Sequence, residues 1–210
     1  MAQRTWQRRA AERPREIVAA ALEVFAEKGF AGAKLDEIAR RAGISKGALY
    51  LYFETKEEIF RAVVREAVAP NIEAVRLSIP GPDRPFAETA PEFLARFAAV
   101  AMEKPIGAVA KMVIGESRNF PELAKVWHDD VVSRAFAILA GMIERGQAAG
   151  EVRAGDPRLY AFSLMGPMVL GILWCETLTP AGGMAIDLAA LARQHCKTVL
   201  RGMLVPEGGR

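Results

Sequence analysis

Three consecutive residues, Lys46, Gly47 and Ala48, are of the types that can read base pairs. A lysine ammonium can donate to the acceptor atoms of guanine, and an alanine methyl can touch the methyl group of thymine. The glycine between them lets the backbone come close to DNA. Lys46 and Ala48 point outward if Leu49 points inward on the same helix, so this chemistry depends on the elements around them.

The flanking residues predict two short helices joined by a tight turn. Apolar residues recur at the spacing of one helical face within 35–42. Gly43 follows, and glycine supplies the left-handed backbone that ends a helix. Ser45 suits the N-cap of the second helix, 45–52, because its hydroxyl can accept from a free backbone N–H. Such a helix-turn-helix places its second helix in the DNA major groove, N-terminus first.

The pattern IA-x-x-AG-I-S-x-G-x-LY-x-YF-x-x-KE-x-I, from Ile38 to Ile59, resembles the DNA-binding domain of TetR-type transcriptional repressors. The resemblance covers roughly residues 15–60. It implies that Tyr50, Tyr52 and Lys56 contact DNA phosphates, which position a protein without reading the sequence. The alternative for the two tyrosines is a partly buried place in the core.

Lys34 departs from the family pattern, which usually has Thr at this position. The usual capping hydroxyl is missing, and a cation at a helix N-terminus opposes the helix dipole. Lys34 therefore either starts its helix weakly or contributes a phosphate contact.

The remaining sequence predicts an all-α fold, because helix formers dominate and strict apolar alternation is absent. Thr55 with Glu58 and Asn119 with Glu122 have capping-box spacing, and Asp156 suits an N-cap. Pro70 should bend its helix, and Pro167 should free a backbone carbonyl. The predicted helices are 14–28, 55–78, 86–104, 105–118, 121–149, 156–178 and 187–204. Loops are predicted at 79–85 and 180–183, and a frayed tail at 206–210.

From about residue 86 the chain also resembles, more loosely, the regulatory domains of AefR-like TetR regulators. This resemblance rests on ES-x-x-FPEL at Glu116–Leu123 and on DPRL followed by GP within 156–167. Large soft side chains are abundant here, and helix bundles place ligand sites between facing helices. We therefore predict a mainly apolar effector cavity, with plain core packing as the alternative for each residue. The candidates are Phe93, Phe97, Met112, Glu116, Phe120, Trp127, His128, Met168 and Trp174, with Glu116, Arg118 or His128 as the polar end.

Composition excludes several other classes of protein. The chain has 210 residues, of which 51% are apolar, and a net charge of +3. Five arginines against one glutamate in residues 1–15 predict a basic arm that attracts phosphate, or else a solvated tail. Cys175 and Cys196 are too few for a disulfide framework or a zinc site. The N-terminus has no signal-peptide core, and the apolar run 164–175 is too short for a membrane span. We expect a soluble, cytoplasmic protein.

An enzyme is disfavoured because the usual catalytic motifs are missing. His128, Asp129 and Asp130 form the only cluster that hints at metal or acid–base chemistry, and consecutive residues on a helix point in different directions. We interpret them as a solvated face, with a metal site as the alternative. No phosphate loop, nucleophile elbow or HExxH occurs. No cofactor is expected.

The sequence predicts DNA binding, and the resemblance implies a homodimeric repressor that binds a near-palindromic operator and is released by a mainly apolar small molecule. Its domains would be 1–55 for DNA binding and 56–210 for ligand binding and dimerisation. The resemblance implies that 156–178 and 187–204 pair with their mates, with Leu191, Val199, Leu200 and Met203 in the interface. The alternatives are an architectural DNA-binding protein without effector, and a small helical enzyme.

Overall fold

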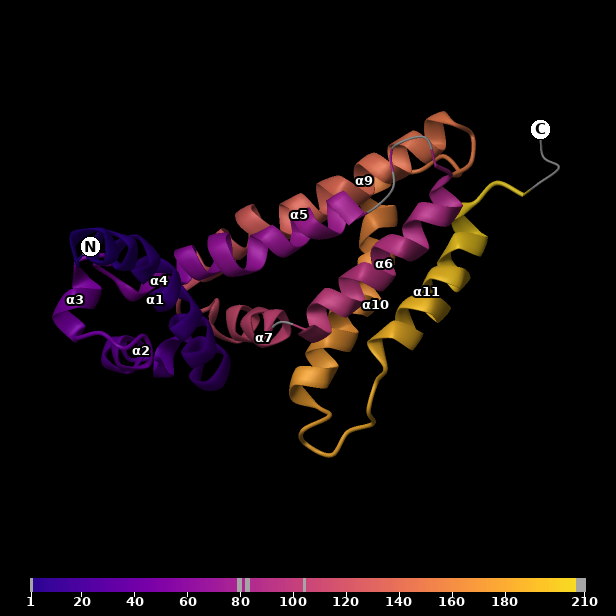
Figure 1. Cartoon of the computed structure of the whole chain (residues 1–210). Coiled ribbons are helices and arrows are strands. Elements are labelled where there is room, and N and C mark those ends of the chain that lie inside the picture. The colour runs from indigo at the N-terminus through magenta and orange to yellow at the C-terminus, as the bar shows by residue number, and fades with distance from the viewer. Residues whose placement is uncertain (1, 79–80, 82–83, 104, 207–210) are drawn as a thin grey trace. The chain divides into compact units, whose positions relative to one another are not determined.

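The structure of the protein is a computed structural model that describes residues 2–78, 81, 84–103 and 105–206, with side chains from residue 13 onward. Within these ranges the fold is helical, and an isolated antiparallel bridge joins Val152 and Leu204, so the predicted all-α class is confirmed (Figure 1). The chain forms two compact units. Unit 1 is Met1–Pro70 with Ala108–Val131, and unit 2 is Asn71–Gly107 with Val132–Arg210. These bounds differ from the predicted division after residue 55.

Unit 1 is built around a cluster of phenylalanine rings. Phe25, Phe30 and Phe60 are buried, and their ring centroids lie 5.6–6.0 Å apart. The helix α1 packs on α2, α4 and the π-helical segment η1 around these rings. The elements are α1 (Ala2–Gly32), α2 (Leu35–Arg41), α3 (Lys46–Tyr50), α4 (Lys56–Ala62), η1 (Val63–Val68), most of α7 (Ile106–Glu116), α8 (Pro121–Trp127) and most of η2 (His128–Val132).

Helix α1 is longer than the sequence predicts. It begins at Ala2, so the backbone of the predicted basic arm is helical, and Pro14 lies inside the helix rather than in its first turn. Gly29 interrupts this helix with φ 71° and ψ 178°. The short turn after Gly29 leads into α2.

The predicted helix 55–78 contains a π-helical segment. Thr55 begins it as the N-cap, accepting from the Glu58 N–H at 3.1 Å, as predicted. In η1 the hydrogen bonds span five residues, and the Ala69 N–H donates to the Val64 carbonyl. Proline has no N–H to donate. A π-helical turn lies just before Pro70, and the bend predicted there stays a prediction.

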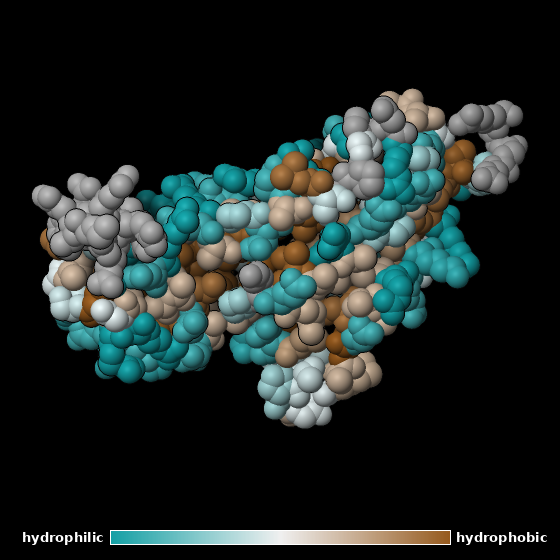
Figure 2. Space-filling view, viewed as in Figure 1, coloured by the Kyte–Doolittle hydropathy of each residue, from teal (hydrophilic) through white to brown (hydrophobic). Residues whose placement is uncertain are grey.

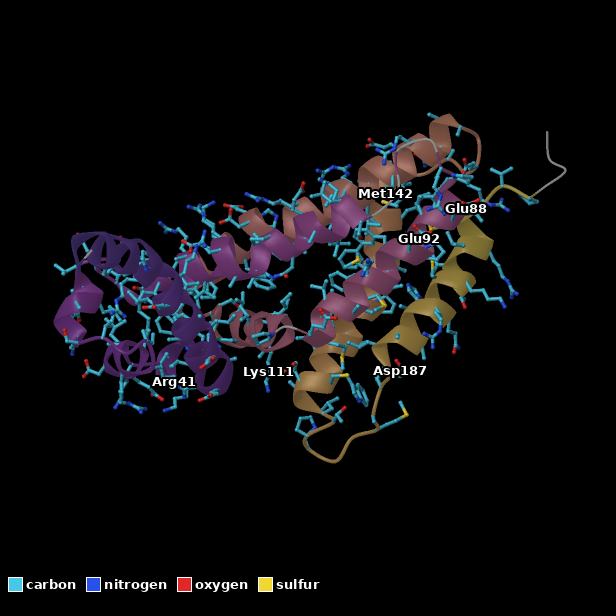
Figure 3. All side chains as sticks on the ribbon, in the orientation of Figure 1. Arg41, Glu88, Glu92, Lys111, Met142 and Asp187 are labelled. Carbon is cyan, nitrogen blue, oxygen red and sulfur yellow. The ribbon has the colours of Figure 1, made fainter. Side chains whose placement is uncertain are left out.

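Unit 2 is a helical bundle in which α6 lies beside α11, and α10 packs on α9 and α11 (Figure 1). The N-cap Asp156 accepts from a backbone N–H group of α10, and the N-cap Asp187, labelled in Figure 3, accepts from two of α11. His195 Nε2 lies 3.1 Å from the Ser163 carbonyl, which Pro167 leaves without its helical donor. The elements are α5 (Ala69–Ser78, from Asn71), α6 (Phe86–Glu103), α9 (Ser133–Ala148), α10 (Pro157–Thr177) and α11 (Leu188–Met203).

Some local predictions are wrong or lie outside the described residues. The capping box at Asn119 is wrong, because α8 begins after Phe120 and has no side-chain cap. Much of the predicted loop 79–85 and the tail from 207 onward lie outside the described residues. Helix α10 has a length and composition that would suit a membrane span, and a third of that apolar window is buried within the structure. Length and composition alone are weak evidence for a span.

Candidate nucleic-acid interface and effector region

The turn between α2 and α3 has the predicted backbone. Gly43 has φ of 66°. Its N–H donates to the Arg40 carbonyl at 3.2 Å, and the Ile44 N–H donates to the Ala39 carbonyl at 3.0 Å. This pair of bonds is a Schellman motif. No atom lies within 4 Å of where a Cβ would stand at Gly43, so the backbone conformation alone requires glycine here.

The N-terminal residues of α3 are open to solvent. Ser45 Oγ accepts from the Ala48 N–H at 3.1 Å, which confirms the predicted N-cap. Leu49 is fully buried, while Lys46 and Gly47 are exposed and Ala48 is half-buried. The side chains therefore have the orientation that base contacts need, and the contacts themselves stay a prediction.

Lys46 has a neighbour that the sequence did not reveal. Its Nζ lies 2.8 Å from Oδ1 of Asp36 on α2. The hydrogen bond to Asp36 raises the pKa of Lys46. Both side chains are exposed, and surface pairs of this kind contribute little to stability. A guanine contact by Lys46 must compete with the Asp36 carboxylate.

The C-terminal end of α3 carries three large exposed side chains. The exposed fractions are 45% for Tyr50, 83% for Leu51 and 38% for Tyr52. Both tyrosine side chains are partly buried and partly exposed. This exposure fits a phosphate contact as well as a partly buried place in the core. Leu51 was not singled out from the sequence, although an apolar side chain this open at the end of α3 is a further candidate for DNA contact.

Lys34 is exposed at the N-cap of α2. Its backbone is extended, and no side chain caps the helix at this position. Asp36 and Glu37 lie in the first turn, where carboxylates suit the positive end of the helix dipole. These acidic residues offset the missing cap. The exposed ammonium of Lys34 remains a candidate for a phosphate contact.

Ion pairs hold α2 against α1. Arg41, at the end of α2 (Figure 3), donates to Glu27 at 2.7 Å and to Glu37 at 3.3 Å, and Lys28 donates to Glu37 at 2.6 Å. Arg41 lowers the pKa of Glu27, and Lys28 with Arg41 lowers that of Glu37. Hydrophilic residues cover the outer face of α2 (Figure 2). Charged residues of α2 thus form ion pairs with α1 as well as facing solvent.

The Lys56 ammonium forms its hydrogen bonds within the protein. Its Nζ donates to the carbonyl oxygens of Phe30 at 2.6 Å, Ala33 at 3.2 Å and Ala31 at 3.4 Å. The same ammonium lies 4.5 Å from the centroid of the Phe30 ring. An ammonium has three N–H donors, and three carbonyl oxygens surround this one. The phosphate contact implied for Lys56 would break these bonds, so the structure favours an internal role.

Glu116 and Phe120, predicted for an effector cavity, contact the DNA-binding helices instead. The Glu116 carboxylate accepts from the N–H groups of Phe30 at 2.7 Å and Ala31 at 2.6 Å. The Phe120 ring lies 4.9 Å from the Phe30 ring, edge to face. Both carboxylate oxygens of Glu116 are occupied, so it is a poor candidate for the polar end of a cavity. Spacing along the chain gives no sign of contacts between residues 86 positions apart.

The other effector candidates are divided between the units. In unit 1, Met112 is buried and Trp127 is half-buried. In unit 2, Phe93 and Met168 belong to one buried cluster, and Phe97 packs against it.

Trp174 and the predicted interface residues also belong to unit 2. The Trp174 indole N–H donates to the Met184 carbonyl at 2.8 Å. Leu200 and Met203, predicted for a dimer interface, are 8% and 2% exposed and belong to the core of the protomer, while Leu191 and Val199 are partly buried against it. The helical pattern of α11 could not distinguish these two uses.

The cluster at residues 128–130 is only partly a solvated face. His128 Nδ1 lies 2.9 Å from Asp129 Oδ1, and both side chains are exposed. Asp130 is buried, against expectation, and accepts from Arg65 Nε at 2.9 Å. The π-helical turn of η2 carries Asp130. Among the described residues, no group of three His, Cys, Asp or Glu side chains could hold a metal ion.

An open groove of about 680 Å³ lies between α1 and η1 in unit 1. It is lined by Arg15, Val18, Ala19, Leu22, Glu66 and Ala67. This groove could not be predicted from the sequence, because its walls come from helices far apart in the chain.

Comparison with known proteins agrees with this geometry. Residues 17–63 match the family described as "Bacterial regulatory proteins, tetR family", and residues 90–192 match "Tetracyclin repressor-like, C-terminal domain". The helix-turn-helix lies in the first match, and Glu116 and Phe120 lie in the second.

Full-length relatives carry the same two parts. The chain is 26% identical to the fatty acid metabolism regulator protein of Bacillus subtilis (strain 168), over 90% of this chain and 94% of that protein. It is 27% identical to the HTH-type transcriptional repressor BepR of Brucella suis biovar 1 (strain 1330), over 94% of each. The solved structure of FadR from Bacillus subtilis, in complex with stearoyl-CoA, shares the fold with a TM-score of 0.74 at 22% identity, over 89% of this chain and 97% of that one. These relatives are regulators and not enzymes, and the chain belongs to the TetR family of bacterial transcriptional regulators.

Proposed function

We propose that this regulator is a cytoplasmic repressor that binds a near-palindromic operator as a homodimer and releases it when a mainly apolar molecule binds. The observation that carries the proposal is that the N-terminal residues of α3 are exposed while Leu49 of the same helix is buried. In a dimer, one such helix from each protomer reads one half-site. The proposed DNA contacts are Lys34, Ser45, Lys46, Gly47, Ala48, Tyr50 and Tyr52.

The dimer interface is proposed on α10. Leu159, Phe162 and Leu170 on this helix are each more than 60% exposed, and Val169 is 38% exposed. Their spacing of three to eight residues places them along one side of the helix. Apolar side chains gathered in this way mark an interaction surface. A second copy of the same helix would cover them symmetrically.

The effector is proposed to be a long-chain acyl thioester. Unit 2 contains an apolar cluster with Phe93 and Met168, and Phe97 beside it. Ligand sites are mostly apolar with a few placed polar groups, and methionine adapts its shape to the ligand. The names of two relatives, a fatty acid metabolism regulator and a regulator in complex with stearoyl-CoA, support this class of compound.

The test begins with selection of bound duplexes from a random pool by the full-length protein. We expect an enriched site with two inverted half-sites, and a protein mass of two chains by light scattering. Titration with stearoyl-CoA should then release the operator, whereas free coenzyme A should not. Release requires that the ligand bind the DNA-incompetent state better. A monomer in solution, or an enriched site without inverted symmetry, would contradict the proposal.

An architectural DNA-binding protein is the second candidate function, favoured by the division of the predicted cavity residues between the two units. A ligand that binds only the folded state raises its melting temperature. If a panel of acyl thioesters and free fatty acids causes no thermal shift and no operator release, the architectural role is the better description.

A further inference from the structure

The short segment Phe30–Ala33, between the break in α1 and the start of α2, is held from both sides by charged groups. The Glu116 carboxylate accepts from its first two N–H groups, at 2.7 and 2.6 Å. The Lys56 ammonium donates to three carbonyl oxygens of the segment, at 2.6, 3.2 and 3.4 Å. We call Glu116 and Lys56 the clamp.

The two charges match the dipoles of the segment. An anion is favourable at the N–H end of a helical turn and a cation at the C=O end. Hydrogen bonds to charged groups are also stronger than neutral ones. Gly29 fits the same arrangement, because its φ is 71° and a Cβ there would lie 2.4 Å from Glu116 Oε1. Both the backbone turn and the carboxylate therefore require glycine.

The clamp lies where it can set the position of the recognition helix. Helix α2 begins at Leu35, two residues after the segment ends, and α3 follows through the fixed turn at Gly43. The ring of Phe30 is fully buried and touches Phe120 as well as the Lys56 ammonium. The start of α2 is thus fixed by contacts from α4 and from the end of α7.

We propose that Glu116 and Lys56 are positioning residues for DNA recognition: they set the direction in which α2 and α3 leave α1. Neither touches DNA in this role. Glu116 lies in the region that matches the C-terminal family domain, 90–192, so that region supplies part of the DNA-reading unit. The proposal rests on the proposed DNA binding for its functional consequence, while its structural consequence can be measured without DNA.

The first experiment measures amide hydrogen exchange in the full-length, DNA-free protein. Glu116→Gln keeps the size of the side chain but cannot accept both N–H groups. We expect exchange to rise about tenfold in residues 30–33, as for local opening, and severalfold in 35–50. Glu103→Gln, at an exposed position ending α6, is the matched control and should change neither region. If protection is lost in 30–33 alone, the clamp does not position α2 and the proposal fails.

The second experiment measures affinity for the selected operator as a function of salt. Glu116→Gln removes a negative charge, which by simple attraction would tighten binding to DNA. A positioning role requires the opposite, and we expect binding about tenfold weaker. Glu116→Asp keeps the charge on a shorter side chain, so its operator affinity should lie between those of Glu116→Gln and wild type. It replaces Glu116→Gln in this experiment if that variant does not fold. Unchanged or tighter binding by Glu116→Gln would overturn the proposal.

Two lysines provide the contrast in this experiment. Lys56→Met should weaken binding at every salt concentration with the salt slope unchanged. Lys34→Met should reduce that slope by about one, as for a lost phosphate contact. A reduced slope for Lys56→Met would make it a phosphate contact and not a positioning residue. If no duplex is selected at all, the proposed function fails. The hydrogen-exchange experiment still tests whether the clamp positions α2, because it needs no DNA.

Discussion

Arg65 Nε donates to Asp130 Oδ2 at 2.9 Å and joins the two π-helical segments, η1 and η2. The Asp130 side chain is 10% exposed and that of Arg65 60%. The chain passes between the compact units shortly after η1, at Pro70, and within η2, at Val131. π-helical turns are rare and often occur at functional positions. The pair thus ties together two of the helices through which the units are connected.

Asp130→Ala should destabilise the protein by about 1–3 kcal/mol, because a charge-assisted bond in a nearly buried place is lost. Asp130→Asn keeps an acceptor and should cost less. The measurement is the midpoint of thermal or urea unfolding. Asp129→Ala, at the exposed neighbouring position, is the control and should lower the midpoint less, because an exposed ion pair such as Asp129–Lys125 contributes little to stability. Equal effects at the two positions would show that the Arg65 pair does not stabilise the fold.

Asp36→Asn should tighten operator binding severalfold. The substitution releases Lys46 from its 2.8 Å ion pair and removes a carboxylate from the side of α2 near α3. Fluorescence anisotropy with the operator and with an unrelated duplex measures both affinity and specificity. In a Lys46→Ala background most of the gain should disappear. A gain that persists there in full would mean that Asp36 acts through general repulsion of phosphates and not by competing for Lys46.

The sequence predicted those parts of the fold that depend on neighbouring residues. The Gly43 turn, the Ser45 cap and the inward Leu49 follow from local backbone preferences, and the structure contains them. Contacts between distant segments could not be predicted in this way. Nothing in the spacing of Glu116 shows that Phe30 is its partner, and its assignment to an effector cavity stays a prediction.

Helix periodicity likewise identified apolar faces without identifying what covers them. Leu200 and Met203 repeat at core spacing on α11, and the same spacing suited a dimer interface. Phe162 and Leu170 on α10 are exposed apolar residues, and only the fold shows their exposure. The DNA-contact and effector residues stay predictions.

Gly43→Ala and Gly47→Ala should have opposite effects on stability. Gly43 has positive φ, so alanine there should cost about 1–2 kcal/mol through backbone strain. Gly47 lies within α3, where a Cβ would make an ordinary contact with Ser45 Oγ at 4.0 Å, and alanine there should stabilise the helix by about 0.5–1 kcal/mol. Urea unfolding measures both. Operator binding should nevertheless weaken in Gly47→Ala, because the added methyl stands on the face proposed to meet the bases. Tighter binding by that variant would remove Gly47 from the interface.

Stability should fall between about pH 9 and pH 11 through Cys196. Burial raises the pKa of this thiol from 9.0 to about 11. The unfolded chain therefore releases the proton first as pH rises, and the folded state binds more protons in this window, so unfolding becomes more favourable. The contribution of Cys196 to the free energy of unfolding is fully present below pH 9. It is lost as pH rises through 11 and amounts to roughly 2–3 kcal/mol in all. Urea unfolding at pH 8 and pH 10.5, compared with Cys196→Ala, isolates it from lysine titration. Parallel pH profiles for the two proteins would contradict this assignment.

Phe162→Glu should convert the proposed dimer to a monomer. Phe162 is 66% exposed on α10, and a carboxylate buried opposite its own copy would be desolvated and close to a like charge. Light scattering after size exclusion measures the mass. Because the Phe162 ring also lies 6.1 Å from Phe136 within the protomer, Leu170→Glu provides a second substitution on the same face.

Leu77→Glu is the matched control for this face, since Leu77 is 67% exposed on α5. It should leave the mass unchanged. Monomers made by Phe162→Glu should retain weak, salt-dependent DNA binding but lose the preference for paired half-sites, because one recognition helix reads only one of them. Dimers that persist in both α10 variants would place the interface elsewhere, and a monomeric Leu77→Glu would move it to α5.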